Sequence, residues 1–308
     1  MKIGMIGSGW SDRVQIPAFQ AVGLNVVGIA ARNYAKTHAI ASKHGIQSFA
    51  DWRDLVHAVD LVSIITPPTT HVEMACFALE HGKHVLCEKP TAMNATEAQA
   101  MLDCAQRFPQ QLALIDHELR FLPMAQTARA ILRSPEIGQI YHIVSTVNMS
   151  GRSDRNQAWD WWSDKTQGGG TLGAMGSHVF DLFYWLCGNI SAIRAELRTL
   201  VSERPFGDSI KPVTSDDFLT TELRFERGAT AQIFMNSVAA VSENTIIIHG
   251  ENGALKLDDD KLWYAPLRGA WQDRTPAHSV MLPESIRYGN FPNGTVYFGH
   301  ALQAWLNG

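Results

Sequence analysis

The chain has 308 residues, of which 45% are hydrophobic and 18% are charged, proportions that are ordinary for a globular protein. Its length is about twice that of a typical domain, which favours two domains. The formal net charge is −4, and the basic residues are scattered rather than gathered into the stripe of a nucleic-acid binder. No apolar run reaches the roughly 18 residues of a membrane span. We therefore expect neither a nucleic acid nor a membrane as a partner.

The start of the sequence and the cysteines indicate the compartment. Residues 1–7 enter an apolar, strand-like run and lack the charged region, apolar core and cleavage site of a secretory signal. The cysteines show no paired spacing, which favours structural thiols over disulfides or a metal site; they are Cys76, Cys87, Cys104 and Cys187. We expect a cytoplasmic protein with no metal site.

Residues 1–120 alternate short apolar runs with amphipathic stretches. The runs have few polar positions, as expected of parallel strands buried on both faces; they cover residues 2–6, 25–30, 61–66, 84–87 and 111–115. Helical patterns separate several of them, at residues 34–44, 52–58, 70–81 and 95–107. This alternation predicts a doubly wound α/β domain over residues 1–120.

The pattern changes after Arg120. A helix over 123–132, a strand over 140–148, a loop rich in tryptophan and glycine, and a helix over 176–186 are expected first. Strand-like runs then follow in succession, at residues 193–201, 218–225, 230–237, 244–250 and 254–257. Turn pairs between some of these runs predict an α+β domain over residues 121–308 with a large, open, mostly antiparallel sheet. Because an open sheet face needs a cover, we expect a homodimer or homotetramer formed through this sheet.

The sequence directly after the first strand, at residues 7–12, is Gly-Ser-Gly-Trp-Ser-Asp. Glycines let the backbone approach a pyrophosphate, and the free N–H groups of a helix start stabilise its charge. Asp12 stands where the fingerprint has its third glycine, so a glycine turn without a ligand remains an alternative. The position between a strand and a helix nevertheless favours a Rossmann dinucleotide site. The predicted cofactor-binding residues are Gly7, Ser8, Gly9, Trp10 and Ser11.

The second strand ends in Ala30-Ala31-Arg32-Asn33. It lacks the carboxylate that usually binds the ribose 2′-hydroxyl of NAD. Arg32, with Asn33 beside it, could instead pair with a 2′-phosphate and stack on the adenine. We therefore predict that the cofactor is NADP, with NAD as the alternative. The other interpretation of Arg32 is a solvent-exposed loop charge.

Four further motifs resemble a known family. They are Thr-Pro-Pro-Thr-Thr-His at 66–71, Glu-Lys-Pro at 88–90, Arg-Phe-Leu-Pro at 120–123, and a triple glycine at 168–170 that leads into Gly-Ser-His-Val-Phe-Asp at 176–181. In this order they resemble the Gfo/Idh/MocA oxidoreductases, typified by glucose–fructose oxidoreductase and inositol dehydrogenases. The resemblance implies an NAD(P)-dependent dehydrogenase or reductase acting on a CH–OH group of a sugar, cyclitol or similar polyol.

The resemblance also implies the catalytic residues. Lys89 would lie beside the nicotinamide and the substrate hydroxyl and relay the hydroxyl proton; the alternative is a surface lysine at the end of a strand. Family members carry an Asp and a His four residues apart on one helical face. The His corresponds to His178, but the Asp position is Ala174. Lys89 and His178 are therefore the catalytic candidates, and a buried structural histidine is the alternative for His178.

Other site residues follow from the same motifs. The substrate candidates are Lys89, Arg120 and His178, together with Trp161 and Trp162, which could stack on a sugar face but more often pack a loop. The remaining cofactor candidates are Thr66, Pro67, Pro68, His71, Glu88, Lys89 and Glu118, the last at a position where the family often has Asn. The resemblance also implies a helical segment after Gly308, so we expect either a naturally shorter member or part of a longer chain.

Three functional hypotheses remain at this point. The first is hydride transfer between a nicotinamide and a sugar-like alcohol. The second is a non-catalytic regulatory protein that senses NAD(P) or a sugar, because one fold supports many functions and Ala174 replaces the family carboxylate. The third is an enzyme that recycles the same bound cofactor in a multi-step reaction such as an elimination.

Overall fold

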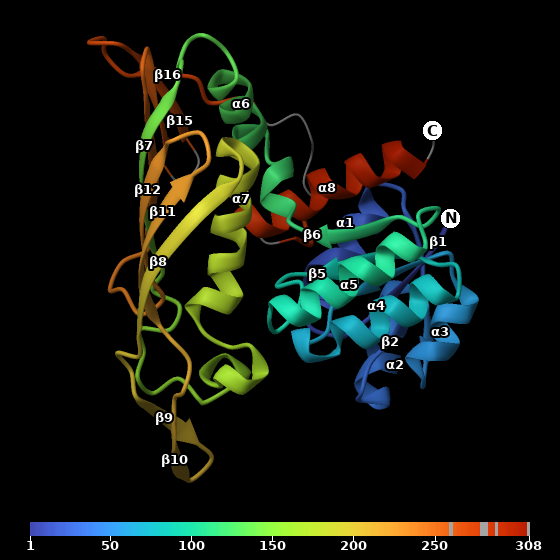
Figure 1. Ribbon diagram of the computed structural model, residues 1–308. Helices are drawn as coiled ribbons and strands as arrows, with labels where there is room; N and C mark the ends of the chain where they lie inside the picture. Colours follow the sequence, from blue (N-terminus) through green and yellow to red (C-terminus); the bar gives the residue numbers. More distant parts are fainter. Residues whose placement is uncertain (259–260, 278–282, 287–288, 307–308) are drawn as a thin grey trace. The chain divides into compact units, whose positions relative to one another are not determined.

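The computed structural model describes residues 1–258, 261–277, 283–286 and 289–306 (Figure 1). The chain forms two compact units, Met1–Leu122 with Ser279–Gly308, and Pro123–His278. The sequence pattern predicts a second domain over residues 121–308. The structure instead returns helix α8 (Asn290–Leu306) to the first unit. The cause is hydrophobic packing, because Phe298 and Leu302 of α8 are buried in the core of that unit.

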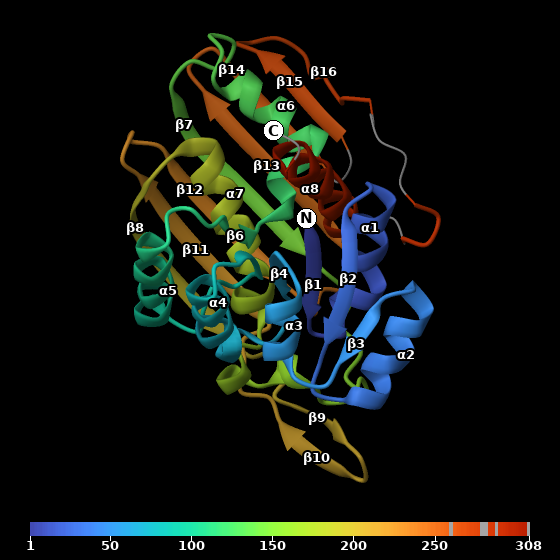
Figure 2. The same ribbon diagram turned by 90° about the vertical axis from the view of Figure 1, so that its right-hand side faces the viewer.

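The first unit contains six parallel strands in the order β3-β2-β1-β4-β5-β6, and Figure 2 shows several of them from the side. The strands are β1 (Lys2–Ile6), β2 (Asn25–Ala30), β3 (Gln47–Phe49), β4 (Leu61–Ile64), β5 (His84–Glu88) and β6 (Ala113–Asp116). The order changes direction between β1 and β4, and sheets of this type bind ligands at the carboxyl ends of the strands near that point. The predicted doubly wound sheet is confirmed.

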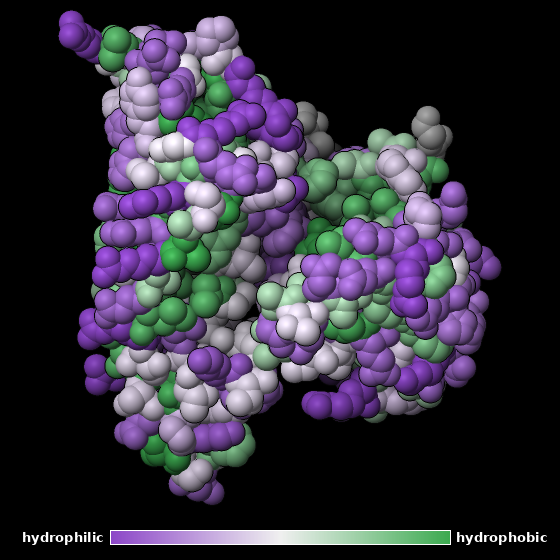
Figure 3. Space-filling model, in the orientation of Figure 1, coloured by the Kyte–Doolittle hydropathy of each residue, from purple (hydrophilic) through white to green (hydrophobic). Residues whose placement is uncertain are grey.

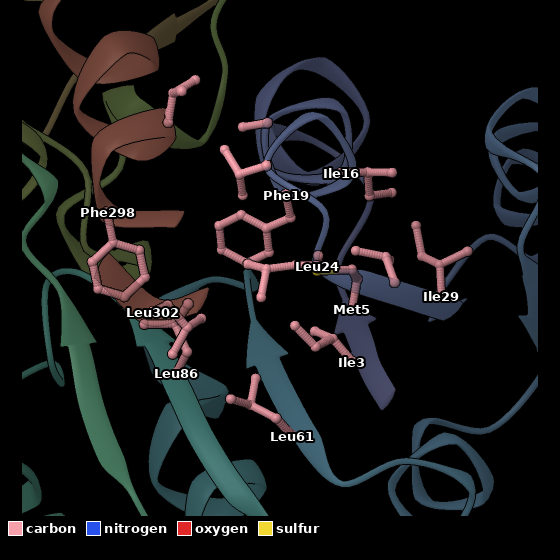
Figure 4. Packing of buried hydrophobic residues seen from close by; sticks show 14 of the residues in the cluster. Ile3, Met5, Ile16, Phe19, Leu24, Ile29, Leu61, Leu86, Phe298 and Leu302 are labelled. Carbon is pink, nitrogen blue, oxygen red and sulfur yellow. The ribbon is translucent and has the colours of Figure 1, made fainter. Parts of the chain in front are cut away.

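Helices cover both faces of this sheet. Helices α1 (Ile16–Ala21), α2 (Tyr34–His44) and α8 contribute to the core on one face. Helices α3 (Trp52–Ala58), α4 (His71–Glu80) and α5 (Ala95–Arg107) contribute to the core on the other. Figure 4 shows Phe19 of α1 and Phe298 of α8 close together above the strands, with 6.4 Å between their ring centroids. Helix α8 is therefore a structural part of the dinucleotide-type unit.

The second unit contains an eight-stranded sheet in the order β16-β15-β14-β13-β7-β12-β11-β8. Among the strand pairs that the structure describes in this sheet, only β7–β12 is parallel, which confirms a mostly antiparallel sheet. Helices α6 (Pro123–Leu132) and α7 (Ser177–Cys187) cover one face (Figure 1). The strands are β7 (Ile140–Asn148), β8 (Ile190–Arg198), β11 (Phe218–Phe225), β12 (Thr230–Asn236), β13 (Glu243–Gly250), β14 (Gly253–Asp258), β15 (Lys261–Pro266) and β16 (Gln272–Asp273). A separate hairpin of β9 (Glu203–Phe206) and β10 (Ser209–Pro212) was not predicted.

Three general features complete the description. The four cysteines are free thiols. Among the described residues, no helix is long and apolar enough to cross a membrane. The same residues contain no group of three His, Cys, Asp or Glu side chains arranged to hold a metal ion.

Candidate active site

The glycine turn at the end of β1 has the backbone geometry that a dinucleotide site needs. Gly7 has a φ of 124°, and a Cβ there would collide with the carbonyl oxygen of Ile65, so only glycine fits. Its N–H donates to the carbonyl oxygen of Ala30 at 2.9 Å, which ties the turn to β2. A Cβ on Gly9 would meet no atom within 4 Å. The backbone at Gly9 is therefore open to the approach of a phosphate group.

The carboxylate at the third-glycine position is neutralised by α2. Asp12 Oδ1 lies 2.8 Å from both Lys43 Nζ and His44 Nε2. Burial opposes ionisation of Asp12, but the hydrogen bonds from Lys43 and His44 outweigh it and lower its pKa. Ser11 is buried, and its hydroxyl donates to the carbonyl oxygen of Gly7 at 2.7 Å. The Ser11 side chain thus stabilises the turn through this hydrogen bond. Ser8 and Trp10 are half-buried.

The end of β2 presents an exposed cation. Arg32 and Asn33 are both exposed, and no Asp or Glu occurs between Ala30 and Tyr34. Asn33 caps α2, because its Oδ1 accepts a 3.0 Å hydrogen bond from the backbone N–H of Lys36. This cap fixes the start of α2 directly after Arg32.

His71 joins two of the predicted cofactor-binding segments. Its side chain is fully buried, with Nε2 2.9 Å from the carbonyl oxygen of Thr66 and Nδ1 3.1 Å from that of Pro90. Burial lowers the pKa of His71, although the carbonyl contacts partly offset this. His71 therefore positions the segment after β4 against the segment after β5. Thr66 and Pro67 are half-exposed or exposed nearby, and Pro68 is buried.

A buried hydrogen-bond network lies at the carboxyl ends of β4, β5 and β6. Its centre is Gln15, a fully buried residue of the short turn η1 (Ser11–Gln15). Gln15 Oε1 accepts from Ser63 Oγ at 2.7 Å, and Gln15 Nε2 donates to Asp116 Oδ2 at 2.8 Å and to Glu88 Oε1 at 3.3 Å. The backbone N–H of Lys89 also lies 3.3 Å from Glu88 Oε2. Two acidic side chains thus converge next to the predicted catalytic lysine.

The electrostatics of this network favour shared protons. Loss of hydration, and secondly the charge of Asp116, raise the pKa of Glu88 to about 8. Burial raises the pKa of Asp116 to about 6, although Gln15 and Lys89 act in the opposite direction. Burial, followed by the charges of Asp116 and Glu88, raises the pKa of Glu118 well above its ordinary value. The positive charge of Lys89 lowers the pKa of all three carboxyl groups but does not outweigh burial, so the three carboxyl groups titrate as a coupled set.

Helix α8 holds Glu118 in place. Glu118 is 4% exposed and begins the turn η3 (Glu118–Phe121). A Cβ on Gly294 of α8 would lie 2.8 Å from the carbonyl oxygen of Glu118, so the close approach requires glycine. Arg120 lies in the same turn and is half-buried.

The predicted residues of the second unit gather around the start of α7. His178 is 3% exposed, and Ala174, which stands at the position of the family Asp, is 5% exposed. Gly169 makes the loop before this helix compact, because a Cβ there would collide with the carbonyl oxygens of Trp161 and Trp162. His178 and Ala174 are thus held on a segment that packs tightly against the tryptophan loop.

The two candidate tryptophans differ in their surroundings. Trp162 lies under Arg152, whose guanidinium carbon is 5.4 Å from the ring centroid and whose Nη2 pairs with Asp160 at 2.9 Å. Trp161 is 47% exposed, and its ring centroid lies 5.9 Å from that of Trp162. Trp162 therefore packs the loop, which leaves Trp161 as the ring with a face available to a ligand.

Three members of the network were not predicted from the sequence. Ser63 is a polar residue within the apolar strand β4, Asp116 ends β6, and Gln15 directly precedes α1. A polar residue at a buried strand position is a usable signal, because such a group needs a hydrogen-bond partner. Gln15 gave no comparable signal, because its partners lie 48 to 101 residues away in sequence.

The strand order and the glycine turn of the first unit are those of a Rossmann dinucleotide-binding domain. The chain matches the family description "Oxidoreductase family, NAD-binding Rossmann fold" over residues 1–115 and "GFO/IDH/MocA C-terminal domain" over residues 125–256. The chain belongs to the Gfo/Idh/MocA oxidoreductase family, and the resemblance in the motifs is confirmed.

Related proteins agree with this assignment. The chain is 33% identical to an oxidoreductase of Synechocystis sp., covering 85% of this chain and 72% of the relative. It is 30% identical to levoglucosan dehydrogenase of Pseudarthrobacter phenanthrenivorans, covering 83% and 73%. A structure of levoglucosan dehydrogenase in complex with NADH and levoglucosan matches with a TM-score of 0.90 at 26% identity, over 100% of this chain and 90% of that one.

Proposed function

We propose that this chain is an NADP-preferring dehydrogenase that transfers a hydride between the nicotinamide and a hydroxyl-bearing carbon of a sugar, cyclitol or similar polyol. The observation that carries the proposal is the set of buried carboxyl groups around Lys89 at the carboxyl edge of the parallel sheet. Perturbed acid and base groups of this kind are typical of catalytic sites. The similarity to levoglucosan dehydrogenase supports a sugar-like substrate.

The glycine turn fits the pyrophosphate of a dinucleotide. The open backbone at Gly9 and the N–H groups that follow it would hold the phosphates. Exposed Arg32 would pair with a 2′-phosphate, and no carboxylate at the end of β2 would repel it. When bound, the nicotinamide supplies the C4 atom that accepts or donates the hydride. The similar structure of levoglucosan dehydrogenase is a complex with NADH, so the test below compares NADP with NAD.

Lys89 would act as the general base in oxidation and as the general acid in reduction. In the oxidation direction the substrate C–H bond breaks with transfer of a hydride, the O–H bond releases its proton to Lys89 Nζ, and a carbonyl group forms. In reduction the Lys89 ammonium returns that proton to the carbonyl oxygen. Glu88 and Asp116 have pKa values raised toward neutrality, so this pair can exchange the proton with Lys89 between turnovers.

His178 would assist from the second unit. Its assignment comes from the family motif, and its near-complete burial fits a group that acts in a water-poor environment. Ala174 leaves His178 without the family carboxylate one helical turn before it. We therefore assign the main acid/base role to Lys89, with His178 as an additional hydrogen-bonding group for the substrate.

The test is steady-state turnover of the purified protein with NADP and, separately, NAD, against levoglucosan, glucose and myo-inositol in both directions. Because a positioned acid/base group contributes about 10²–10⁴-fold, Lys89→Ala should lower kcat/KM by at least about 100-fold while cofactor binding persists. Lys36→Ala, which removes an exposed lysine of α2, is the matched control and should leave kcat/KM unchanged.

The sensor hypothesis makes the opposite prediction. Tight cofactor binding with no turnover of any sugar or polyol, unaffected by Lys89→Ala, would support a regulatory protein and contradict the dehydrogenase. Consumption of substrate without a net change in nicotinamide absorbance would instead support a reaction that recycles the bound cofactor.

We further propose that the chain forms a homodimer or homotetramer through the open face of the eight-stranded sheet. Along β11, Leu219 and Leu223 face the helices and are buried, whereas Glu222 and Arg224 on the other face are exposed. Phe234 of β12 shares that outer face and is 44% exposed. Figure 3 shows green hydrophobic residues between purple hydrophilic ones on the surface of this unit. Size-exclusion chromatography with light scattering tests this assembly, and Phe234→Lys should yield monomers.

A further inference from the structure

A single buried arginine holds the turn that carries Trp161. Arg152 is 9% exposed and lies in the loop after β7. Its Nη1 donates to Asp160 Oδ2 at 3.1 Å, and its Nη2 donates to Asp160 Oδ1 at 2.9 Å. Nη2 also donates to Ser163 Oγ at 3.1 Å, and the guanidinium carbon lies 5.4 Å from the ring centroid of Trp162. One guanidinium group therefore contacts residues 160, 162 and 163.

These contacts lie on both sides of Trp161. Asp160 directly precedes the turn η4 (Trp161–Ser163), and its carboxylate binds Arg152 instead of capping this turn. Two parallel hydrogen bonds between a guanidinium fork and a carboxylate fix both the distance and the angle between the groups. The backbone on each side of Trp161 is thus held, while the Trp161 side chain is 47% exposed. Trp161 is therefore an exposed aromatic ring on a fixed support.

Arg152 is anchored in turn to the large sheet and to the hairpin of β9 and β10. Its backbone N–H donates to the carbonyl oxygen of Ser237, which follows β12, at 3.1 Å. Arg204 of β9 is 2% exposed. Its Nη2 donates to the carbonyl oxygen of Arg152 at 2.6 Å, and its Nη1 donates to that of Asp154 at 2.7 Å. The hairpin therefore supplies a second buried arginine that supports the first.

The turn is also joined to the segment that carries His178. The hydroxyl of Ser215 donates to the carbonyl oxygen of Trp162 at 2.6 Å. A Cβ on Gly169 would collide with the carbonyl oxygens of Trp161 and Trp162, so the chain that leads toward α7 packs directly on the turn. His178 lies at the start of α7. Trp161 and the proposed substrate-binding histidine thus belong to one tightly packed part of the second unit.

We propose that Arg152 is a positioning residue for the substrate site, and that Trp161, which it holds, selects cyclic sugars and cyclitols over open-chain polyols. This inference rests on the proposed function, because it takes Trp161 as a substrate-binding residue. A pyranose or cyclitol ring presents several C–H groups on one face, and these pack against the electron-rich face of an aromatic ring. An open-chain polyol must lose rotational freedom about its C–C bonds to present the same surface, which weakens its binding.

The experiment measures calorimetric binding of levoglucosan, myo-inositol and 1,5-anhydroglucitol to the protein with saturating NADPH, whose reduced nicotinamide prevents oxidation of the alcohols. Sorbitol is the matched open-chain compound, because 1,5-anhydroglucitol has the same carbon skeleton closed into a ring. We expect 1,5-anhydroglucitol to bind about tenfold more tightly than sorbitol. Trp161→Ala should weaken binding of the cyclic compounds by about tenfold and that of sorbitol by less than about twofold. Trp161→Phe, which keeps an aromatic face, should retain most of the affinity.

A double-mutant cycle tests the role of Arg152. Arg152→Gln should weaken binding of the cyclic compounds as Trp161→Ala does. Because Arg152 acts through Trp161, the variant Arg152→Gln/Trp161→Ala should bind them no more weakly than either single variant. Asp160→Asn weakens the same fork at a partly exposed residue and should act in the same direction if Arg152→Gln does not fold. Arg155→Gln, at an exposed arginine of the same loop, is the control and should leave every Kd unchanged.

The outcomes separate the parts of the inference. Equal Kd values for sorbitol and 1,5-anhydroglucitol, or no binding of any cyclic compound, would overturn the substrate class. Additive losses of affinity in Arg152→Gln/Trp161→Ala would overturn the positioning role of Arg152. The readout is binding rather than turnover, so selective binding of cyclic compounds without any turnover would contradict the proposed dehydrogenase alone.

Discussion

The side-chain amide of Gln15 donates a 2.8 Å hydrogen bond to Asp116 Oδ2, although the two residues are 101 positions apart in the sequence. Its oxygen accepts from Ser63 Oγ at 2.7 Å, so the amide has one orientation, with its nitrogen toward the carboxylates. This contact joins the turn after β1 to the end of β6. It links the segment proposed to bind phosphate with the carboxyl groups proposed to exchange protons with Lys89.

Replacement of Gln15 by Leu should destabilise the protein and change its pH–rate profile. The variant leaves the Ser63 hydroxyl and the Asp116 carboxylate without their buried partner, which costs about 1–3 kcal/mol per unsatisfied group. We expect the free energy of unfolding in urea to fall by about 2 kcal/mol. Loss of the hydrogen bond that favours the Asp116 carboxylate should also move the acidic limb of kcat/KM to higher pH.

The matched control is Gln99→Leu. Gln99 on α5 donates a 2.7 Å hydrogen bond to Asp103, but at an exposed position. Its loss should change the free energy of unfolding by less than about 0.5 kcal/mol and leave the pH–rate profile unchanged. Equal effects of the two variants would contradict a special role for the buried network.

The stability of the protein should decrease as the pH rises through neutrality. The pKa of Glu88 is 4.5 in the unfolded reference and about 8 in the folded state. Between these values the folded state retains a proton that the unfolded state has lost, so raising the pH favours unfolding across this window. Asp116 adds a contribution of the same sign at lower pH, up to about 6.

Urea unfolding at intervals from pH 5 to pH 9 measures this dependence, and Glu88→Gln should flatten it. Groups that face Glu88 are Asp116, Lys89, Gln15 and Glu118, and all remain in the variant. Identical slopes for wild type and variant would show that Glu88 does not titrate in the assigned window.

Much of the fold could be predicted because the deciding interactions are local. The bounds of α2 follow from its Asn33 cap and from Gly45 in the left-handed conformation, both of which are readable from the sequence. The buried parallel strands were equally accessible through their apolar runs. The assignment of α8 to the first unit could not be predicted. The contacts of Phe298 and Leu302 with the core of that unit join the two ends of the chain, and no local sequence pattern encodes such a contact.

The residues of the candidate site likewise fall into those that local motifs predict and those that depend on contacts distant in the sequence. Gly7 and Lys89 lie in contiguous motifs, so their positions at strand ends could be predicted. The network around Gln15 depends on strand order, which brings β4, β5 and β6 together at one edge. The role of Asp12 at the third-glycine position also required the structure, because its partners Lys43 and His44 belong to another helix.

Arg32→Ala should weaken NADPH binding selectively. A hydrogen bond between charged groups contributes about 1.5–3 kcal/mol, which corresponds to a roughly 10- to 100-fold increase in Kd. NADH lacks the 2′-phosphate, so its Kd should change by less than about threefold. Fluorescence titration with each cofactor measures both constants, with Arg107→Ala on α5, an exposed arginine paired with Glu80, as the control. Tighter binding of NADH than NADPH by the wild type would refute the proposed cofactor preference.

Gly294→Ala should destabilise the first unit by up to about 2 kcal/mol and disturb Glu118. The added Cβ would lie 2.8 Å from the carbonyl oxygen of Glu118 and 2.9 Å from its Cγ, and a backbone atom cannot move away as a flexible side chain can. Overpacking costs about 1–3 kcal/mol, partly offset by the roughly 1 kcal/mol that Ala gains over Gly in a helix. Gly299→Ala in the same helix receives the same helical gain, but its Cβ would meet the side chain of Val22 at 3.1 Å.

The measurement is the difference in Tm between the two variants, together with the pH dependence of turnover. A lower Tm for Gly294→Ala with a shifted pH profile would link α8 to the titration of Glu118, whereas equal Tm values would mean that the backbone of Glu118 can yield to the methyl group.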